Sequence, residues 1–367
     1  MKVVFRADAS LQIGSGHIMR CLTLADALKA DGAECHFICR EHPGHLLDFI
    51  RSKGYNTHSL INASSPVDPV VVDAVQPVHA HWLGTTQLQD AAASIAILET
   101  IKPEWMVVDH YALDASWEAS VREHARKILV IDDLADRNHL CDLLLDQNLG
   151  HSKQDYVGRV PENCRLLIGA QYALLRPEFA RLRSASLKRR RVPQLAHILI
   201  TMGGVDQQNA SGAVLRALKS CALPEDCTIS VIMGLTAPWI EDVSEAAEQM
   251  PWPTEVLQNV TDMGARMVAA DLVIGAAGGS AWERCCLGVP TILVILADNQ
   301  KSGAGALAAS GSAIVLGPVS AICDGLKPAV YSLTHTGKLR AMSQSASNVA
   351  DGLGVQRVIK YMGDRDE

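Results

Sequence analysis

Short apolar runs alternate with longer amphipathic stretches along the whole chain. The apolar runs predict β-strands at residues 3–5, 35–39, 106–108, 128–131, 143–145, 198–201, 228–232, 255–257, 272–274, 291–296 and 313–315. Apolar positions at helical spacing predict helices at about 17–30, 115–126 and 210–220. Strands that alternate with helices indicate an α/β fold, in which helices cover both faces of parallel sheets.

Both halves of the chain begin with the same order of elements: an apolar strand, a glycine turn and a helix, at residues 3–30 and 198–220. This repeat predicts two doubly wound, Rossmann-like domains, 1–180 and 197–350, joined by an irregular charged linker, 181–196. A C-terminal helix or tail follows at 351–367. Ligands of such sheets bind beyond the carboxyl ends of the strands, so we expect the site in a cleft between the domains. Residues 61–81, rich in proline, predict an extended surface excursion.

Composition excludes several classes of protein. The 367 residues carry 33 Lys and Arg against 40 Asp and Glu, a net charge of −7, which argues against a nucleic-acid partner. The sequence shows neither a signal peptide nor an uncharged run of spanning length, so we expect a cytoplasmic protein without a membrane partner. Ten scattered cysteines without a Cys-x-x-Cys motif predict reduced thiols. The oligomeric state stays open, with a monomer as one case.

A glycine-rich turn with a histidine follows the first strand. Gly14 and Gly16 flank Ser15 and let the backbone approach a ligand, and the amides that begin the next helix favour an anion. His17 adds a group that titrates near neutral pH. A purely structural strand-turn-helix would show the same residues, so the turn alone leaves both interpretations open.

Polar side chains follow several later strands and are expected at the same edge of the sheet. Asp109 and Tyr111 follow one strand directly. One interpretation of the next cluster is a metal site, and the other is a set of loop braces that form charge-assisted hydrogen bonds. The cluster comprises Asp133, Asp136, His139, Asp142 and Asp146. We favour the braces, because no pair has a ligand spacing such as His-x-x-x-His.

A second glycine cluster predicts a nucleotide site in the C-terminal half. Small residues would let a diphosphate lie against the backbone where a helix begins, at Gly278, Gly279, Ser280 and Ala281. Glu283 lies within the first turn, where a carboxylate can accept hydrogen bonds from ribose hydroxyls. Asn299 and Gln300 end the following apolar strand and would meet the sugar.

These motifs resemble two groups of enzymes. The Gly-Gly-Ser-x-x-Glu helix and the Gly-Val-Pro strand are similar to the donor half of GT-B nucleotide-sugar enzymes, among them the transferase that makes lipid II. The N-terminal motif Arg-x-Asp-x5-Gly-x-Gly-His-x-x-Arg-Cys resembles the UDP-2,4-diacetamido-2,4,6-trideoxy-β-L-altropyranose hydrolases of pseudaminic acid biosynthesis. So do Val-Asp-His-Tyr, Asp-Asp-Leu-Ala-Asp-Arg-x-His, Leu-Asp-Gln-Asn and Tyr-Ala-Leu-Leu-Arg-Pro-Glu-Phe. The resemblance covers residues 1–354.

The resemblance implies a GT-B fold and release of UDP by attack of water at the anomeric carbon, with inversion and without a metal or other cofactor. His17 would be the base, and the amides at 14–16 and 279–281 would hold the diphosphate. Other expected contacts are Tyr111, Asn299 and Gln300 with the acetamido sugar, Glu283 with the ribose, and Asn259 with Val260 at the uracil edge. Arg6, Asp8 and Arg20 are candidates either for ligand contact or for bracing loops.

Three classes of function follow. Hydrolysis of a UDP-sugar is favoured, because a binding protein would not need a histidine beside a phosphate loop. A GT-B glycosyltransferase is the alternative, although the N-terminal half has no long apolar or basic patch suited to a lipid acceptor. A nucleotide-sugar-binding protein without catalysis ranks third.

Overall fold

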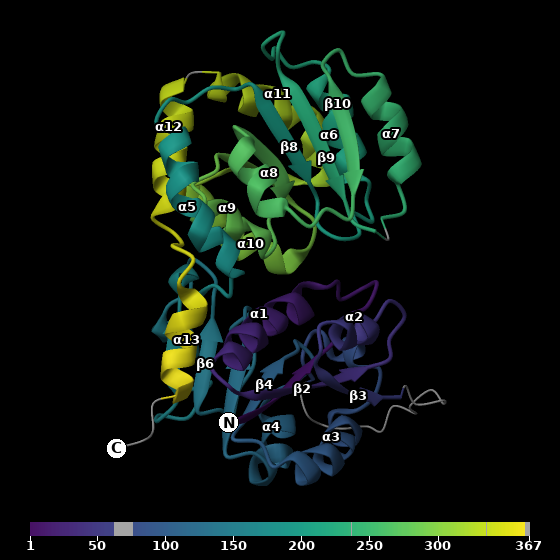
Figure 1. Ribbon diagram of the computed structural model, residues 1–367, viewed down its shortest axis with the longest axis vertical. Helices are drawn as coiled ribbons and strands as arrows, with labels where there is room; N and C mark the ends of the chain where they lie inside the picture. The colour runs from purple at the N-terminus through teal and green to yellow at the C-terminus, as the bar shows by residue number, and fades with distance from the viewer. Residues whose placement is uncertain (62–75, 236, 335, 364–367) are drawn as a thin grey trace. The chain divides into compact units, whose positions relative to one another are not determined.

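The computed structural model describes residues 1–61, 76–235, 237–334 and 336–363. The chain forms two compact units; in Figure 1, unit 1 is coloured from purple to teal and includes the yellow helix α13 (Gly354–Gly363), and unit 2 is coloured from teal to yellow. Unit 1 comprises Met1–Leu174 with Val355–Glu367, and unit 2 comprises Leu175–Gly354. Each unit contains its own parallel sheet, so the α/β class with two doubly wound sheets is confirmed.

Unit 1 has a seven-stranded sheet in the order β3-β2-β1-β4-β5-β6-β7. Its strands are β1 (Lys2–Ala7), β2 (Glu34–Arg40), β3 (Asn56–Leu60), β4 (Trp105–Asp109), β5 (Lys127–Ile131), β6 (Leu143–Asp146) and β7 (Arg165–Ile168). The pattern of apolar runs did not predict β3 and β7, which form the two edges of this sheet. An edge strand has a neighbour on one side alone and tolerates more polar residues than a central strand.

Helices cover both faces of this sheet. Alternate side chains of β1 point to opposite faces, so Val3 and Phe5 pack on one side and Val4 packs on the other. The first face is covered by α1 (Gly16–Ala30), α2 (Leu47–Ser52) and α13 (Gly354–Gly363). The second face is covered by α3 (Gln87–Ile101) and α4 (Ala115–Val121). The last helix thus returns to the N-terminal unit, where Trp105 Nε1 donates to the carbonyl of Met362.

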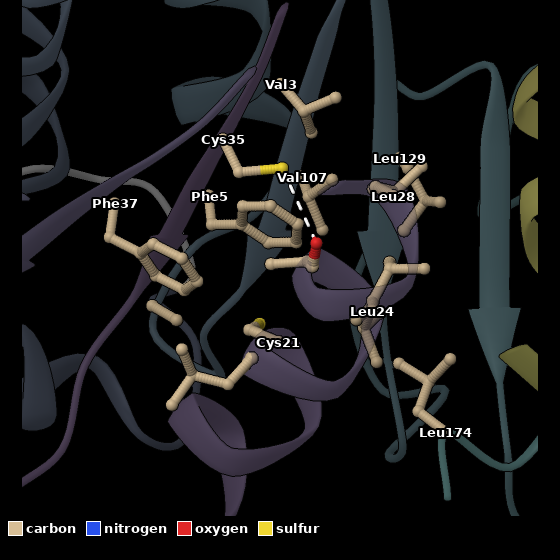
Figure 2. Close-up of a cluster of buried hydrophobic side chains, with 14 of the residues drawn as sticks. Val3, Phe5, Cys21, Leu24, Leu28, Cys35, Phe37, Val107, Leu129 and Leu174 are labelled. Atoms are coloured by element: carbon tan, nitrogen blue, oxygen red, sulfur yellow. Dashed lines mark hydrogen bonds between the residues drawn. The ribbon is translucent and has the colours of Figure 1, made fainter. Parts of the chain in front are cut away.

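The core beneath α1 fixes the position of that helix on the sheet. Figure 2 shows Leu24 and Leu28 of α1 directed at the strands, beside Phe5 and Phe37. The two phenyl rings stack with centroids 4.8 Å apart. Because these side chains are fully buried, they hold α1 against this face of the sheet. All ten cysteines are free thiols, as expected.

Unit 2 has a six-stranded sheet in the order β10-β9-β8-β11-β12-β13. Its strands are β8 (His197–Thr201), β9 (Thr228–Met233), β10 (Thr254–Gln258), β11 (Leu272–Ala276), β12 (Thr291–Ile295) and β13 (Ile314–Pro318). One face packs against α6 (Ala210–Leu218), α7 (Ile240–Glu248) and α11 (Ile322–Leu333). The remaining helices are α5 (Pro177–Arg189), α8 (Met263–Ala269), α9 (Ser280–Cys286), α10 (Lys301–Ala309) and α12 (Thr336–Ser347).

The expectation of an irregular linker at 181–196 is wrong for most of that segment. Residues up to Arg189 are helical in α5, which packs against α8 and α9 within unit 2. Two of the basic residues bond to backbone carbonyl groups: Arg190 donates to Ala270 and Met267, each at 2.8 Å, and Arg183 donates to Ala350 at 3.0 Å. Arg183 and Arg190 therefore satisfy carbonyl groups of neighbouring backbone segments, which composition alone cannot reveal.

Two smaller expectations also change. The helix expected at 115–126 ends at Val121 and continues as a short 3-10 turn, Arg122–His124. Of the excursion expected at 61–81, residues 62–75 lie outside the described residues. Beyond them, Ala80–Leu83 forms a 3-10 turn rather than extended chain.

Candidate functional site

The strand order of unit 1 brings two predicted loops together. The chain proceeds from β1 to β2 and β3 on one side, whereas β4 leads to β5, β6 and β7 on the other. The carboxyl ends of β1 and β4 are therefore neighbours at the point where the winding reverses, with Ala7 paired to Asp109. Ligands of open α/β sheets bind at such a reversal.

The loop after β1 leaves open space around its glycines. Gly14 has a φ of 79°, which favours glycine, and its amide donates to the Ser10 carbonyl at 2.8 Å. A Cβ atom at Gly14 or Gly16 would meet nothing within 4 Å. Within the described ranges, no side chain caps α1 at Ser15. As far as the described residues go, the start of this helix is thus unobstructed, as an anion site requires.

His17, in the first turn of α1, is held by a buried carboxylate. Its Nδ1 atom lies 2.5 Å from Oδ1 of Asp109, at the end of β4. Arg20, one turn further along α1, donates to both oxygens of Asp109 at 2.6 Å. Asp109 is fully buried, so it acts on His17 and Arg20 rather than at the protein surface.

This arrangement selects one tautomer of the His17 imidazole. Burial alone would raise the pKa of Asp109, but Arg20 and His17 outweigh burial and hold that pKa well below its ordinary value. An ionised carboxylate only accepts hydrogen bonds, so Nδ1 of His17 carries the proton. Nε2 of a neutral His17 is then the basic nitrogen, and no side chain in the described part of the chain bonds to it.

Asp133 connects the same cluster to Tyr111. Its carboxylate accepts from Arg20 Nη1 at 2.5 Å and from the Tyr111 hydroxyl at 2.8 Å, and Asn148 donates to its backbone carbonyl. The Tyr111 ring meets the His17 ring edge-on at 4.6 Å between centroids. Burial and Asp133 raise the pKa of Tyr111, which stays a neutral phenol. The sequence suggested Asp133 as a brace but could not show which residues it braces.

Arg6 and Asp8 form a separate buried network. Both are fully buried, and Arg6 Nη1 lies 2.6 Å from Asp8. Arg6 also pairs with Asp90 at 2.7 Å, and Asp90 accepts from Arg40 at 2.6 Å. Of the two roles expected for Arg6 and Asp8, this geometry favours bracing of the sheet edge over ligand contact, because neither side chain is exposed. Asp90 and Arg40 were not predicted.

The five residues considered for a metal site do not converge. Each has a different partner: Asp133 pairs with Arg20, Asp136 with Arg137, His139 with Glu118, Asp142 with Arg122 and Asp146 with His151. Among the described residues, no group of three His, Cys, Asp or Glu side chains could hold a metal ion. The geometry therefore agrees with loop braces.

In unit 2 the winding reverses between β8 and β11, and the loop after β11 contains the second glycine cluster. Gly279 is exposed, and a Cβ atom there would meet nothing within 4 Å. Arg284, which the sequence analysis did not single out, holds both ends of this loop. It donates to the Ala276 carbonyl at 2.6 Å and to Ser280 Oγ at 3.1 Å. Burial lowers the pKa of Arg284 to about 10.

Glu283 lies on α9 with its side chain 19% exposed. Arg176 is 3.7 Å from Glu283 and 3.1 Å from Glu178, so the two carboxylates share one guanidinium. Burial raises the pKa of Glu283 despite the opposing effect of Arg176. The carboxylate remains an accessible acceptor beside the loop.

The other predicted contacts lie at loop ends of the same sheet. Gln300 faces the glycine loop: its Nε2 atom lies 3.6 Å from the Cβ position of Gly278, and its Oε1 accepts from Leu296. Asn299 is exposed one residue earlier. Asn259 and Val260 follow β10, three strand positions from β11, and Asn259 has a φ of 50°. Their roles stay predictions.

Comparisons with known proteins relate the chain to nucleotide-sugar enzymes. Residues 197–357 match the model of the glycosyltransferase family 28 C-terminal domain. The chain is 28% identical over 249 residues to the UDP-2,4-diacetamido-2,4,6-trideoxy-beta-L-altropyranose hydrolase of Campylobacter jejuni, covering 68% of this chain and 75% of that protein. It is 21% identical over 305 residues to the uncharacterized protein MJ1062 of Methanocaldococcus jannaschii, with 82% of this chain covered. The match spans 57% of the length of MJ1062.

Solved structures establish the fold. The crystal structure of Acinetobacter baumannii MurG has a TM-score of 0.68 to this chain at 16% identity, covering 98% of this chain and 99% of that one. Together with the two parallel-sheet units, this likeness confirms the expected GT-B fold. None of the helices in the described ranges combines the length and apolar character needed to cross a bilayer.

Proposed function

We propose that this protein is an enzyme that hydrolyses a UDP-linked sugar at the anomeric carbon–oxygen bond, with inversion, releasing UDP and the free sugar. The observation that carries the proposal is the pair formed by His17 and Asp109 beside an unobstructed glycine loop. The similarity to the Campylobacter jejuni hydrolase supports a UDP-linked diacetamido trideoxy sugar as the substrate and a place in pseudaminic acid biosynthesis. A cytoplasmic location stays part of this proposal.

In the proposed reaction, water attacks the anomeric carbon while the bond to the diphosphate oxygen breaks. UDP leaves with the bonding electrons, and one proton of the water passes to Nε2 of His17. Asp109, which accepts from Nδ1 at 2.5 Å, stabilises the imidazolium that forms. UDP is a good leaving group, so the reaction does not require a second carboxylic acid to protonate it.

Backbone amides are proposed to bind the diphosphate, where negative charge grows as the bond breaks. In unit 1 the expected amides are those of residues 14–16, of which Gly14 already donates to the Ser10 carbonyl, so Ser15 and Gly16 are the proposed donors. In unit 2 the expected amides are those of residues 279–281, of which Ala281 already donates to the Gly278 carbonyl, so Ser280 and the exposed Gly279 are the proposed donors. Glu283 is proposed to accept from the ribose, and Asn259 with Val260 to meet the uracil. Tyr111, Asn299 and Gln300 remain the proposed contacts of the sugar.

A glycosyltransferase is the second candidate, because residues 197–357 match a glycosyltransferase domain and the fold is that of MurG. The two reactions differ in the nucleophile that attacks the anomeric carbon. In a transferase, the same histidine would deprotonate an acceptor hydroxyl rather than water.

One experiment separates the two candidates. Purified protein is incubated with the UDP-linked diacetamido trideoxy sugar in EDTA and oxygen-labelled water, without an acceptor, and the products are followed by NMR and mass spectrometry. Hydrolysis predicts UDP release with the label in the sugar. Turnover that needs an added acceptor would assign a transferase instead, and label in UDP would contradict attack at carbon.

A further inference from the structure

A group of aromatic rings extends from Tyr111 toward the surface of unit 1. Trp82, in the 3-10 turn Ala80–Leu83, stacks on Tyr111 with centroids 5.7 Å apart and an interplanar angle of 27°. His79 contacts both rings, at 4.4 Å from Trp82 and 5.5 Å from Tyr111. We call His79, Trp82 and Tyr111 the aromatic platform.

The platform is joined to the proposed catalytic group. Tyr111 meets His17 edge-on at 4.6 Å, so one ring separates Trp82 from the base. The turn that carries Trp82 also contacts the glycine loop after β1, because His81 Nε2 lies 3.2 Å from Gln12 Nε2. The turn and the loop thus border the same site from two sides.

The outer rings of the platform are not core residues. Trp82 and His79 are half-buried, whereas Tyr111 is 5% exposed. A half-buried indole beside a reactive group presents an apolar face and excludes water there. Burial lowers the pKa of His79 below its ordinary value, which favours a neutral ring in the platform.

We infer that the aromatic platform binds the sugar of the substrate through its methyl groups, and so selects N-acetylated 6-deoxy sugars. The inference rests on the proposed function and names the part of the substrate that unit 1 recognises. A diacetamido trideoxy hexose carries a methyl group at C6 and one on each acetamido group. These apolar groups gain free energy when they leave water for an aromatic face, whereas a 6-hydroxyl group loses its hydrogen bonds to water there.

The test uses Trp82→Leu and Trp82→Phe in the full-length protein. For the UDP-linked diacetamido trideoxy sugar, Trp82→Leu should lower kcat/KM about ten- to hundredfold, and Trp82→Phe should restore most of it. The preference for that sugar over UDP-N-acetylglucosamine, which has a 6-hydroxyl group, should shrink. The affinity for UDP should not change. The matched control for mutation of this region is Leu88→Ala, because Leu88 on α3 is 75% exposed.

A second readout keeps the platform separate from catalysis. Saturation-transfer NMR should detect the acetamido and C6 methyl protons of the bound UDP-sugar in the wild type and lose them in Trp82→Leu. If the wild type turns over no UDP-sugar but shows this transfer, the proposed hydrolysis fails and the platform stands. An unchanged kcat/KM in Trp82→Leu, or an equal loss for both sugars, overturns the platform. The absence of saturation transfer to the methyl protons in the wild type also overturns the platform.

Discussion

Nδ1 of His17 lies 2.5 Å from a carboxylate oxygen of Asp109, and the two residues come from elements far apart in the chain, α1 and the end of β4. Arg20 holds the same carboxylate through both of its oxygens. The charge of Asp109 is thereby fixed, and with it the proton on Nδ1. This relationship leaves Nε2 of His17, in the first turn of α1, as the nitrogen that the proposed reaction uses as the base.

Replacing His17 tests its role as the base. His17→Asn should lower kcat about 10²- to 10⁴-fold, the usual contribution of general acid–base catalysis, while UDP affinity changes little. Steady-state kinetics and calorimetry with UDP measure the two quantities. A variant that keeps wild-type kcat, or that loses UDP binding and activity equally, would make His17 a phosphate or loop contact.

Asp109→Asn tests the carboxylate without removing the base. The amide is neutral and cannot stabilise an imidazolium, so kcat should fall about 10²- to 10⁴-fold with UDP affinity retained. The variant should also unfold more easily, because Arg20 loses a buried partner, at a cost of about 3–5 kcal/mol. Cys21→Ser is the control, since its thiol also contacts Asp109, at 3.5 Å, but carries no charge. Equal kcat in wild type and Asp109→Asn would remove Asp109 from the mechanism.

The predictability of the fold depended on how deeply each strand is buried. Strands such as β5 and β12 are buried on both faces and need apolar side chains at nearly every position. Their apolar runs can therefore be recognised in the sequence. β3, with the sequence Asn-Thr-His-Ser-Leu, forms an edge and was missed. The charges at 181–196 suggested an irregular linker, whereas residues up to Arg189 are helical and Arg190, just beyond α5, bonds to backbone carbonyls.

The sequence shows which loops carry the candidate site, but it does not show which side chains contact one another there. The glycines and His17 have a local pattern that can be recognised in sequence. The partnership with Asp109 arises because β4 lies next to β1, which depends on the strand order of the whole sheet. Arg284 was missed for a more local reason, because the Ala276 carbonyl at the end of β11 comes within its reach only when the turn between β11 and α9 forms.

Glu283→Ala tests the proposed ribose contact. Loss of a charged acceptor should weaken UDP binding by about 1.5–3 kcal/mol while the fold survives. Glu178→Ala is a matched control, because Glu178 pairs with the same guanidinium of Arg176. Calorimetry should show weakened binding in the first variant alone. Equal effects in both would attribute the change to Arg176 rather than to a ribose contact.

Gly279→Ala tests the backbone loop. A methyl group there meets no protein atom within 4 Å, and φ is −53°, so the stability of the fold should not change. The methyl group would occupy the space assigned to the diphosphate, and UDP affinity should fall at least tenfold. Gly305→Ala, in α10, is the control, since a Cβ atom there also has no neighbour within 4 Å. Unchanged UDP affinity in Gly279→Ala would move the diphosphate elsewhere.

His139 predicts a pH dependence of stability that is separate from catalysis. Its ring lies between Glu118, at 2.7 Å, and Asp132, at 3.8 Å. Burial lowers the pKa of His139, but the two carboxylates outweigh burial and raise it from 6.5 to about 9. A raised pKa in the folded state means that protonated His139 stabilises the fold. This stabilisation, about 3 kcal/mol, is complete below pH 6.5 and is lost as the pH rises through about 9.

His139→Gln should therefore destabilise the protein by about 3 kcal/mol more at pH 6 than at pH 10, because the wild-type ring is neutral at the higher pH. Urea denaturation at both pH values measures the difference. His124→Gln is the control, since His124 is partly exposed and lies 3.9 Å from an exposed carboxylate, Glu99, so its effect should be small at either pH. A loss of stability in His139→Gln that is equal at both pH values would mean that His139 contributes through packing and not through its charge.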